Sequence, residues 1–584
     1  MYLATILALV IVLVNAPLST AQHSLASNLL YDWGFYGLFP RTWYKSFALA
    51  SPRLNFVRWD AQCGDGYYLL SPRGSYVWNP GPVILDAQGR LIWTDDRFGM
   101  VTDVKTQTYR GSQYLTFWNG ENGVLHGYGK GKYFMLDETY QVFKVIEPVG
   151  TGLTGDLHEF KITDHGTALI TIYDPVPADL TPIGGPANGW VLDSIFQEID
   201  IENSTLLFEW RASEHVPLNH TDHPYPCPDN GLSPRFAFDF FHINSIDKDA
   251  RGNYVISSRH TNTIMGVSPT GETLWTWGGQ HNMFRDLSGG RATDFKYQHH
   301  ARLHADNRIS LFDNAKSERD SGAYSRGMLV SLDTKQLTAK LLQEFTDSYS
   351  ELSASQGSMQ LLGDTGKVLL GYGFLPSFTE LAPDGRVLCD VRFAPWIISN
   401  IGMVTSYRAF KSTRWVGRPS HPPSIFLRPS EGLLYTSWNG ATLVRRWVLQ
   451  GGNWDDIRQD LYSDLLEQEK DGFEAVFPIN DEMPSYLRIV AVGEDGQVLG
   501  RTEVLNRKVG NAPSTHIRDV VIVVSVFLVI TVTAVLQRRM IIRVLRASSI
   551  PKSIRFHQVA YWWKEWKRKQ KRTKKSELEP LYHD

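Results

Sequence analysis

A hairpin pattern that recurs six times constrains the fold of this 584-residue chain more than any other feature of its sequence. The pattern is a strand that ends in Asp, a turn of two to four residues that contains Gly, and a second strand with Leu and Trp, and most copies match it in part. Such turns between short apolar runs are typical of antiparallel β-hairpins. The copies lie at residues 84–93, 134–145, 196–210, 265–277, 330–342 and 378–391. Repeated β units are therefore expected.

The spacing of the copies helps to choose between two all-β folds. The hairpins are about 50 to 70 residues apart, further short strands such as residues 158–173 lie between them, and few stretches have the length and period of a helix. A stacked sandwich is the alternative, but a long regular period favours radial repetition of four-stranded blades. We predict an all-β, six-bladed β-propeller whose closing blade uses residues 424–450 and 487–504.

Two apolar segments predict targeting and a membrane anchor. Residues 3–14 are apolar and uncharged, and Ser19, Thr20 and Ala21 follow, which is typical of a signal peptide cleaved after residue 21. An uncleaved anchor is the alternative, since no Lys or Arg precedes this run. A second apolar run, residues 520–536, has about the minimum length that spans a bilayer, and a buried β-rich segment is its alternative.

The charge after the second run favours a membrane span. Residues 538–584 contain fourteen Lys or Arg against four Asp or Glu, whereas the whole chain has a formal net charge of −2. Basic residues beside a span stay on the cytoplasmic side, and the tail's Trp residues suit contact with an anionic leaflet, a plain solvated tail being the alternative. We predict a single-pass type I protein with a signal peptide (1–21), a lumenal or extracellular propeller (22–505), a stalk (506–518), a transmembrane helix (519–537) and a basic cytoplasmic tail (538–584). The remaining, acidic body has no nucleic-acid footprint.

The cysteines and the glycosylation sequons agree with a secreted body. Cys63, Cys227 and Cys389 allow one disulfide and one free thiol, and the sequence does not define the pair. Asn203 and Asn219 each begin an Asn-x-Thr sequon on the lumenal side of the span, so both are predicted glycosylation sites.

Polar residues at the starts of the innermost strands are the candidates for function, because these positions line the channel of a propeller. His158, His242 and His299 occupy comparable places in three consecutive units. One such histidine alone more often bonds a turn, but three together favour a site. Segments 355–362 and 437–442 are the expected inner strands of two further units. Other polar residues accompany the histidines: Asn244, Arg259, Arg302 and Asn314.

The chemistry of these groups suggests an anionic ligand. Buried Arg and Asn need partners, and the sequence suggests no matching excess of carboxylates nearby. Guanidinium, amide and imidazole groups that converge suit a sulfate or phosphate group with three equatorial oxygens. A second histidine group, His215, His220 and His223, lies in a Pro-rich stretch beside a sequon, which favours an exposed linker over a metal site. We therefore predict neither a metal nor a cofactor.

Several of these segments together resemble the arylsulfotransferase family in its fungal-type branch. They are HEFKITDHGTALIT, FQEIDIENSTLLFEW, FHINSIDKDARGNYVISSRH, QHHAR, LFDNA, SQGSMQLL and SWNGAT, and the resemblance covers roughly residues 70–450. It implies a six-bladed propeller related to bacterial aryl sulfate sulfotransferases. It also implies that a sulfuryl group passes from an aryl sulfate to a phenolic acceptor through a sulfohistidine, without a nucleotide donor. The chain contains no G-x-x-x-x-G-K-[ST] loop, in agreement with this scheme.

The resemblance assigns roles by motif. It makes His299 the nucleophile, gives Arg259 and Asn244 the sulfuryl oxygens, and makes His242 or His158 the general acid and base. His300 stands where many fungal-type relatives have Asp, which leaves open which of residues 299 and 300 faces the channel. Arg302, Asn314 and Trp438 are further candidates for substrate binding.

A second class of function remains. A propeller that kept its fold and lost turnover would act as a binding scaffold or as a secondary-metabolite tailoring protein, because a shared propeller does not fix function. The histidines, Asn244 and Arg259 occur together, which favours the enzyme. The sequence predicts no oligomeric state.

Overall fold

The computed structural model describes residues 25–121, 127–226, 230–317, 319–453 and 461–508. Over these residues the protein is all-β, as predicted, and its helices are α2 (Leu25–Asp32), α3 (Ala212–His215) and short 3₁₀ turns. None of these described helices is long and apolar enough to cross a membrane. The predicted signal peptide, membrane span and tail lie outside the described residues.

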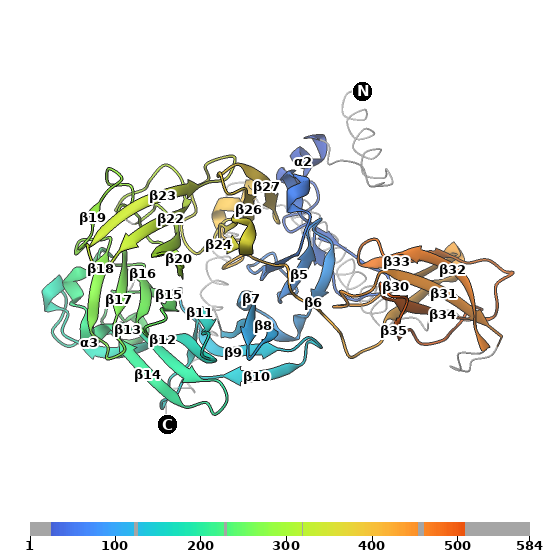
Figure 1. The fold of residues 1–584 in the computed structure, drawn as a ribbon, viewed down its shortest axis with the longest axis horizontal. Helices are drawn as coiled ribbons and strands as arrows, with labels where there is room; N and C mark the ends of the chain where they lie inside the picture. Colours follow the sequence, from blue (N-terminus) through green and yellow to red (C-terminus); the bar gives the residue numbers. More distant parts are fainter. Residues whose placement is uncertain (1–24, 122–126, 227–229, 318, 454–460, 509–584) are drawn as a thin grey trace, which may run out of the picture. The chain divides into compact units, whose positions relative to one another are not determined.

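Five consecutive four-stranded antiparallel sheets, of which the first two are joined into one sheet of eight strands, follow one another in chain order (Figure 1). A single pairing of Gly155 with Gly131 joins the first two. The strands are β7 (Val101–Tyr109), β8 (Ser112–Glu121), β9 (Lys130–Leu136) and β10 (Val142–Ile146); β11 (Gly155–Ile162), β12 (Thr167–Ala178), β13 (Gly189–Asp200) and β14 (Leu206–Arg211); β15 (Ile243–Lys248), β16 (Tyr254–Ser258), β17 (Thr263–Val267) and β18 (Thr273–Trp277); β20 (His299–His304), β21 (Arg308–Asp313), β22 (Arg326–Asp333) and β23 (Thr338–Phe345), with β19 (Arg285–Asp286) beside β23; and β24 (Ser358–Leu362), β25 (Lys367–Gly371), β26 (Ser377–Leu381) and β27 (Val387–Arg392).

Strands from both ends of this region complete the arrangement. β28 (Phe410–Ser412) pairs with β4 (Tyr67–Leu70), which continues through β5 (Val83–Asp86) to β6 (Leu91–Thr94) as a sixth sheet. β3 (Asn55–Arg58) adds a fifth strand to β27. The first strands β28, β7, β11, β15, β20 and β24 each contact the next, and β24 contacts β28, so the six form a closed ring. Candidate side chains on these strands are thereby brought together.

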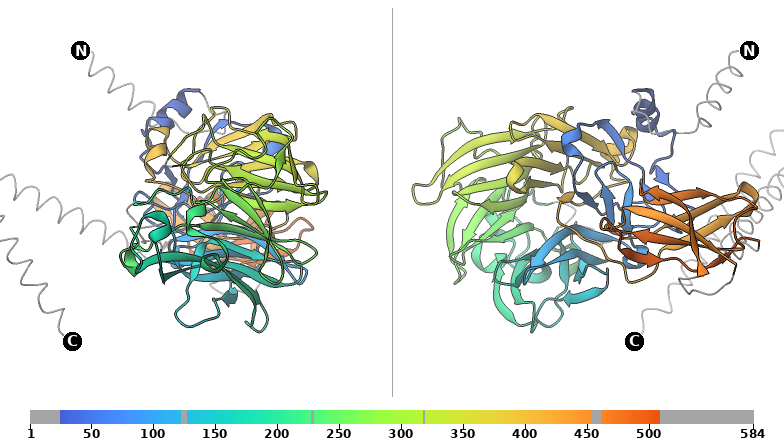
Figure 2. Two further views of the ribbon diagram at one scale, coloured as in Figure 1. Left: turned by 90° about the vertical axis from the view of Figure 1, so that its left-hand side faces the viewer. Right: turned by 45° about the vertical axis from the view of Figure 1, so that its right-hand side comes forward.

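The prediction that residues 424–450 and 487–504 close the ring is wrong. They belong to two further sheets, shown in orange in Figure 2. The cause is packing: Leu427 and Leu434 of one sheet share a core with Leu449 and Ile489 of the other. Segment 437–442, expected as an inner strand, only begins where β30 ends. The strands are β29 (Ser424–Arg428), β30 (Leu433–Ser437) and β33 (Glu474–Pro478), and β31 (Arg446–Gly452), β32 (Ser463–Glu469), β34 (Tyr486–Val492), β35 (Val498–Arg501) and β36 (Leu505–Asn506). A two-stranded sheet, β1 (Arg41–Thr42) with β2 (Ser51–Pro52), precedes the ring.

The recurring Asp of the hairpins explains their turns. Asp86 Oδ1 accepts hydrogen bonds from the main-chain N–H groups of Gln88 and Arg90, both at 2.9 Å. Gly89 between them has a φ of 80°, which Gly adopts without steric cost. The same acceptor role recurs in other turns, at Asp137, Asp200, Asp249, Asp333 and Asp384.

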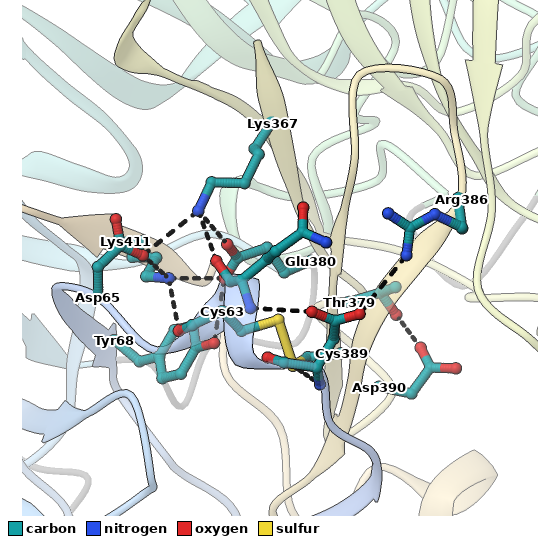
Figure 3. Close-up of a disulfide and its surroundings, with 12 residues drawn as sticks. Cys63, Asp65, Tyr68, Lys367, Thr379, Glu380, Arg386, Cys389, Asp390 and Lys411 are labelled. Atoms are coloured by element: carbon teal, nitrogen blue, oxygen red, sulfur yellow. Dashed lines mark hydrogen bonds and ion pairs between the residues drawn. A yellow bond between two sulfur atoms is a disulfide. The ribbon is translucent and has the colours of Figure 1, made fainter. Parts of the chain in front are cut away.

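A disulfide between Cys63 and Cys389 ties the two ends of the ring together (Figure 3). It joins the 3₁₀ turn Ala61–Cys63 to β27, across 326 residues of sequence. Beside it, Lys411 Nζ lies 2.7 Å from Glu380 Oε2 and 3.1 Å from Asp65 Oδ1. The third cysteine, Cys227, lies outside the described residues.

Candidate functional site

The three predicted histidines lie where the innermost strands are bulged. The pairing register shifts between Gly155 and Phe160 on β11, between Ile243 and Ser245 on β15, and between His299 and Arg302 on β20. His242 and His300 have φ angles of 58° and 56°, a left-handed conformation that costs a non-Gly residue of order 1 kcal/mol. A bulge gives up regular pairing and re-aims side chains. Regular strand pairing is thus interrupted where the polar side chains turn toward one another.

Two of the histidines are held by carboxylates. His158 Nδ1 lies 2.6 Å from Asp156 Oδ2, and His242 Nδ1 lies 2.5 Å from Asp239 Oδ2. A carboxylate accepts, so each Nδ1 carries the proton and each neutral ring keeps a lone pair on Nε2. The two rings are 4.8 Å apart between centroids. The expectation that carboxylates are missing near the histidines is therefore wrong.

His299 is fixed in the same tautomer by uncharged acceptors. Its Nδ1 lies 2.7 Å from Asn314 Oδ1 and 2.8 Å from the carbonyl oxygen of Tyr297. Nε2 therefore has the lone pair, and the N–H of Gln356 donates to it at 3.3 Å, a long hydrogen bond. Asn314, predicted to bind substrate, orients this imidazole. Its Nδ2 donates to the carbonyl oxygens of Ser353 and Gln356.

Arg259 is positioned by aromatic rings and by a fourth histidine. Its guanidinium lies over the ring of Tyr297 at 3.7 Å, and its Nη1 donates to His260 Nε2 at 2.6 Å. His260 Nδ1 in turn donates to the carbonyl oxygen of Asp239. The ring centroids of His260 and His242 are 4.7 Å apart. Arg259 is therefore held at the edge of the histidine cluster, by which we mean His158, His242, His260 and His299.

Burial keeps three imidazoles of this cluster neutral. The pKa values of His242, His260 and His299 are all held well below the usual range, first by burial and then by neighbouring histidines and Arg259. Neutral Nε2 atoms are nucleophiles and proton acceptors at physiological pH. The cluster can therefore attack an electrophile or take up a proton without first losing one.

Three of the predicted residues have partners outside the histidines. Asn244 Nδ2 donates to the carbonyl oxygen of Gln298 at 2.7 Å, which uses one of its two amide N–H groups. Arg302 points away from the histidines and pairs with Glu159. Trp438 lies after β30, where its Nε1–H donates to the carbonyl oxygen of His421. His300 also faces away: its Nδ1 lies 2.9 Å from the carbonyl oxygen of Met359, which leaves His299 as the histidine of the cluster.

Two buried donors that the sequence did not indicate lie beside His299. Tyr407 is 1% exposed, and its ring lies 5.5 Å from that of His158 and 6.3 Å from that of His299. Arg73 Nη2 donates to Gln356 Oε1 at 3.3 Å. Burial lowers the pKa of Arg73 to about 10, so it remains a cation at neutral pH. Within the described part of the chain, Arg73 Nη1 and the Tyr407 hydroxyl have no hydrogen-bond partner. Both groups can therefore donate to an anionic ligand.

One group of described residues has the composition of a metal site. Asp239, His242 and His260 each offer one ligand atom, all within 4.8 Å of one another. However, Asp239 Oδ2 and His242 Nδ1 are bonded to each other, and Arg259 donates to His260 Nε2. A cation beside this guanidinium would be repelled, so the hydrogen-bonded arrangement suits protons better than a metal.

Residues 105–394 match the model of a family described as arylsulfotransferase (ASST). No curated protein matches the chain. A protein of unknown function from Bacteroides caccae is 11% identical with a TM-score of 0.35, over 59% of this chain and 98% of its own. The allergen Mala s 1 of Malassezia sympodialis is 13% identical with a TM-score of 0.28, over 57% and 86%. Sqt1 of Saccharomyces cerevisiae is 11% identical with a TM-score of 0.27, over 78% and 100%.

Proposed function

Because the chain belongs to the arylsulfotransferase-like family, we propose that it transfers a sulfuryl group from an aryl sulfate to a phenolic acceptor through a sulfohistidine, without a nucleotide donor. The observation that carries this proposal is the state of His299. Asn314 and Tyr297 hold the proton on Nδ1, so Nε2 is a neutral nucleophile among other imidazoles. The six sheets are then the blades of a six-bladed β-propeller, and the site lies in its central channel.

In the first half-reaction, His299 Nε2 attacks the sulfur atom. The S–N bond forms as the bond from sulfur to the aryl oxygen breaks, and the phenolate leaves with a proton from Nε2 of His242 or His158, which takes up that proton when the anionic donor binds beside it. In the second half-reaction, the same imidazole takes the proton of the incoming phenol, whose oxygen displaces His299 from sulfur. Asp239 and Asp156 stabilise the imidazolium that each histidine becomes in turn.

Charge that develops on the sulfuryl oxygens needs donors that are already in place. Arg259 and Asn244 are the predicted donors. Arg73 Nη1 and the Tyr407 hydroxyl are further candidates because neither has a partner within the described residues. The N–H of Gln356, which donates to the free His299 Nε2, would turn to a sulfuryl oxygen once that nitrogen is bonded to sulfur.

The predicted topology completes the proposal. Residues 1–21 direct the body into the secretory pathway, residues 519–537 anchor it as a single-pass type I protein, and residues 538–584 remain cytoplasmic. Asn203 and Asn219 are both exposed, as acceptors of glycans must be. Substrates would therefore reach the site from the lumen or the cell exterior.

Intact-protein mass spectrometry tests the nucleophile. The full chain in detergent is incubated with nitrophenyl sulfate and quenched under mildly alkaline conditions. We expect a mass increase of one sulfuryl group that is lost in His299→Ala and kept in His300→Ala, a matched change at the neighbouring buried imidazole. An adduct that survives His299→Ala would place the nucleophile elsewhere. Neither adduct nor phenol release across several donors would favour the binding scaffold.

A further inference from the structure

A buried cluster of charged residues crosses the interior of the ring beside the histidines. We call it the floor: Asp103, Lys105, Glu159, Arg302 and Arg408. Its members come from β7, β11, β20 and the residue two places before β28. The side chains of Asp103, Glu159 and Arg408 are 0% exposed.

Glu159 is the central anion of the floor. Its Oε1 lies 3.0 Å from Lys105 Nζ and 3.3 Å from Arg408 Nη1, and its Oε2 lies 2.5 Å from Arg302 Nη2. Burial would raise the pKa of Glu159, but Arg302, Arg408 and Lys105 outweigh it and hold that pKa well below the usual range. Asp103 adds a second anion, 2.7 Å from Arg408 and 2.6 Å from Lys105. Three cations thus face two fully buried carboxylates.

The floor has the histidine cluster on one side. Arg408 follows Tyr407, whose ring contacts His158, and Arg408 Nη2 donates to the carbonyl oxygen of Asn244 at 2.8 Å. A displacement of Arg408 would therefore disturb residues in direct contact with the histidine cluster.

A cavity of about 270 Å³ lies on the other side of the floor. Lys105, Arg302 and His300 line it, together with residues from all six first strands, and it opens to solvent; His158, His242 and His299 do not line it. The floor thus lies between this cavity and the histidines.

Separation from water matters for the proposed reaction, on which this inference rests. Either a phenol or a water molecule can attack the sulfohistidine. In both cases the S–N bond breaks and an S–O bond forms while His242 or His158 takes a proton, but attack by water ends in inorganic sulfate. Exclusion of water is a recognised way to suppress such side reactions. We propose that the floor, through Glu159, keeps water away from the sulfohistidine and so selects phenols over water as acceptors.

Removal of the central anion should open the floor. In Glu159→Gln, Lys105 and Arg408 would keep the carboxylate of Asp103, whereas Arg302 would lose its carboxylate partner. Uncompensated buried charges are strongly unfavourable, so the cations would separate or draw water in from the cavity. If the floor only fills the core and has no functional role, Glu159→Gln would lose the same stability without a change in the choice of acceptor.

The experiment measures this choice. The full chain is given an aryl sulfate donor and a phenol acceptor, and both free sulfate and sulfated acceptor are quantified. In Glu159→Gln we expect the ratio of sulfate to sulfated acceptor to rise by about tenfold or more, since specificity is a ratio of competing rates. Glu198→Gln is the matched control. Glu198 is also buried, with Lys248 Nζ at 2.6 Å, but it lies on β13, outside the floor, and its change should leave the ratio unaltered.

A second variant covers the case in which Glu159→Gln does not fold. Arg302 is 12% exposed toward the cavity, so Arg302→Ala would open a path to Glu159 without leaving an unpaired buried cation. It should raise the same ratio. An unchanged ratio in folded Glu159→Gln or, if that variant does not fold, in Arg302→Ala would overturn the inference while leaving the sulfotransferase proposal standing. A wild-type protein that consumes no donor would overturn both.

Discussion

Replacing Asp239 with Asn should separate proton transfer by His242 from the other functions of the site. Asp239 Oδ2 accepts from His242 Nδ1 at 2.5 Å, whereas the hydrogen bond of His260 goes to the main-chain oxygen of Asp239, which the substitution retains; Asp239 Oδ1 lies further away, 3.7 Å from His260 Nδ1. Arg259, which is held by His260, should therefore stay in place. The new amide can turn its N–H toward Nδ1, which favours the tautomer with the proton on Nε2. That nitrogen could then no longer accept the proton of the acceptor phenol.

The expected loss of rate follows from the role of His242 as a general base. General base catalysis contributes about 10²- to 10⁴-fold, equivalent to about 3–5 kcal/mol of the activation free energy. We expect a loss in this range for acceptor phenols that are protonated at the assay pH. A phenol already ionised at that pH needs no base, so its loss should stay below about tenfold.

The assay is the rate of sulfuryl transfer, as kcat/KM for a series of phenols of rising pKa with one donor at one pH. Asp156→Asn serves as the parallel change at the other carboxylate and histidine pair. If His158 is the base, Asp156→Asn will show the dependence on acceptor pKa and Asp239→Asn will not. Equal losses across the series in both variants would refute the reasoning and leave the two carboxylates as structural supports.

Three further predictions concern stability and the corrected site. Burial holds the pKa values of four histidines well below about 6.5, so the unfolded chain binds protons first, and stability should fall by up to about 1.4 kcal/mol per histidine per pH unit below pH 6.5; melting temperatures equal at pH 7 and pH 5 would contradict this. The four are His242, His260, His299 and His300. In calorimetry, replacing Cys63 and Cys389 by Ser should cost up to about 6 kcal/mol by the chain-entropy relation for their separation of 326 residues, which is roughly 8 °C if the ring unfolds as one unit; an unchanged melting temperature would argue against that relation. Trp438→Ala should leave donor turnover within about twofold, because independent sites do not couple; a large loss would place the C-terminal sheets in the reaction.

The hairpins could be predicted from sequence because each turn is a local interaction. Asp86 and Gly89 fix their turn within five residues, and the same acceptor chemistry repeats along the chain. The ends of the ring could not be predicted in the same way. β28 is only three residues long and has no hairpin pattern of its own, whereas the C-terminal sheets contain strong hairpins that pack against each other instead. Local signals therefore identified the repeating units but assigned the closing one to the wrong segment.

The same distinction between local and long-range signals applies to the residues of the candidate site. His158, His242 and His299 could be found because repetition places them at one position of successive units. Their carboxylate partners left a short-range signal that could have been used, since Asp156 and Asp239 stand two and three residues before their histidines. Arg73 and Tyr407 gave no such signal, because nothing near them in the sequence repeats.

Arg73 and Tyr407 reach the histidines only through the closure of the ring. The main chain of Arg73 exchanges two hydrogen bonds of 2.9 Å with that of Thr405, and the N–H of Ser71 donates to Ser406 Oγ at 3.0 Å. These contacts join the N-terminal part of the ring to the segment that carries Tyr407, and the disulfide lies in the same two regions of sequence. An open ring would keep the histidines and their carboxylates but would lack both buried donors. Closure of the ring therefore completes the anion-binding side of the site, which gives a physical reason for holding together with a covalent bond what strand pairing already joins.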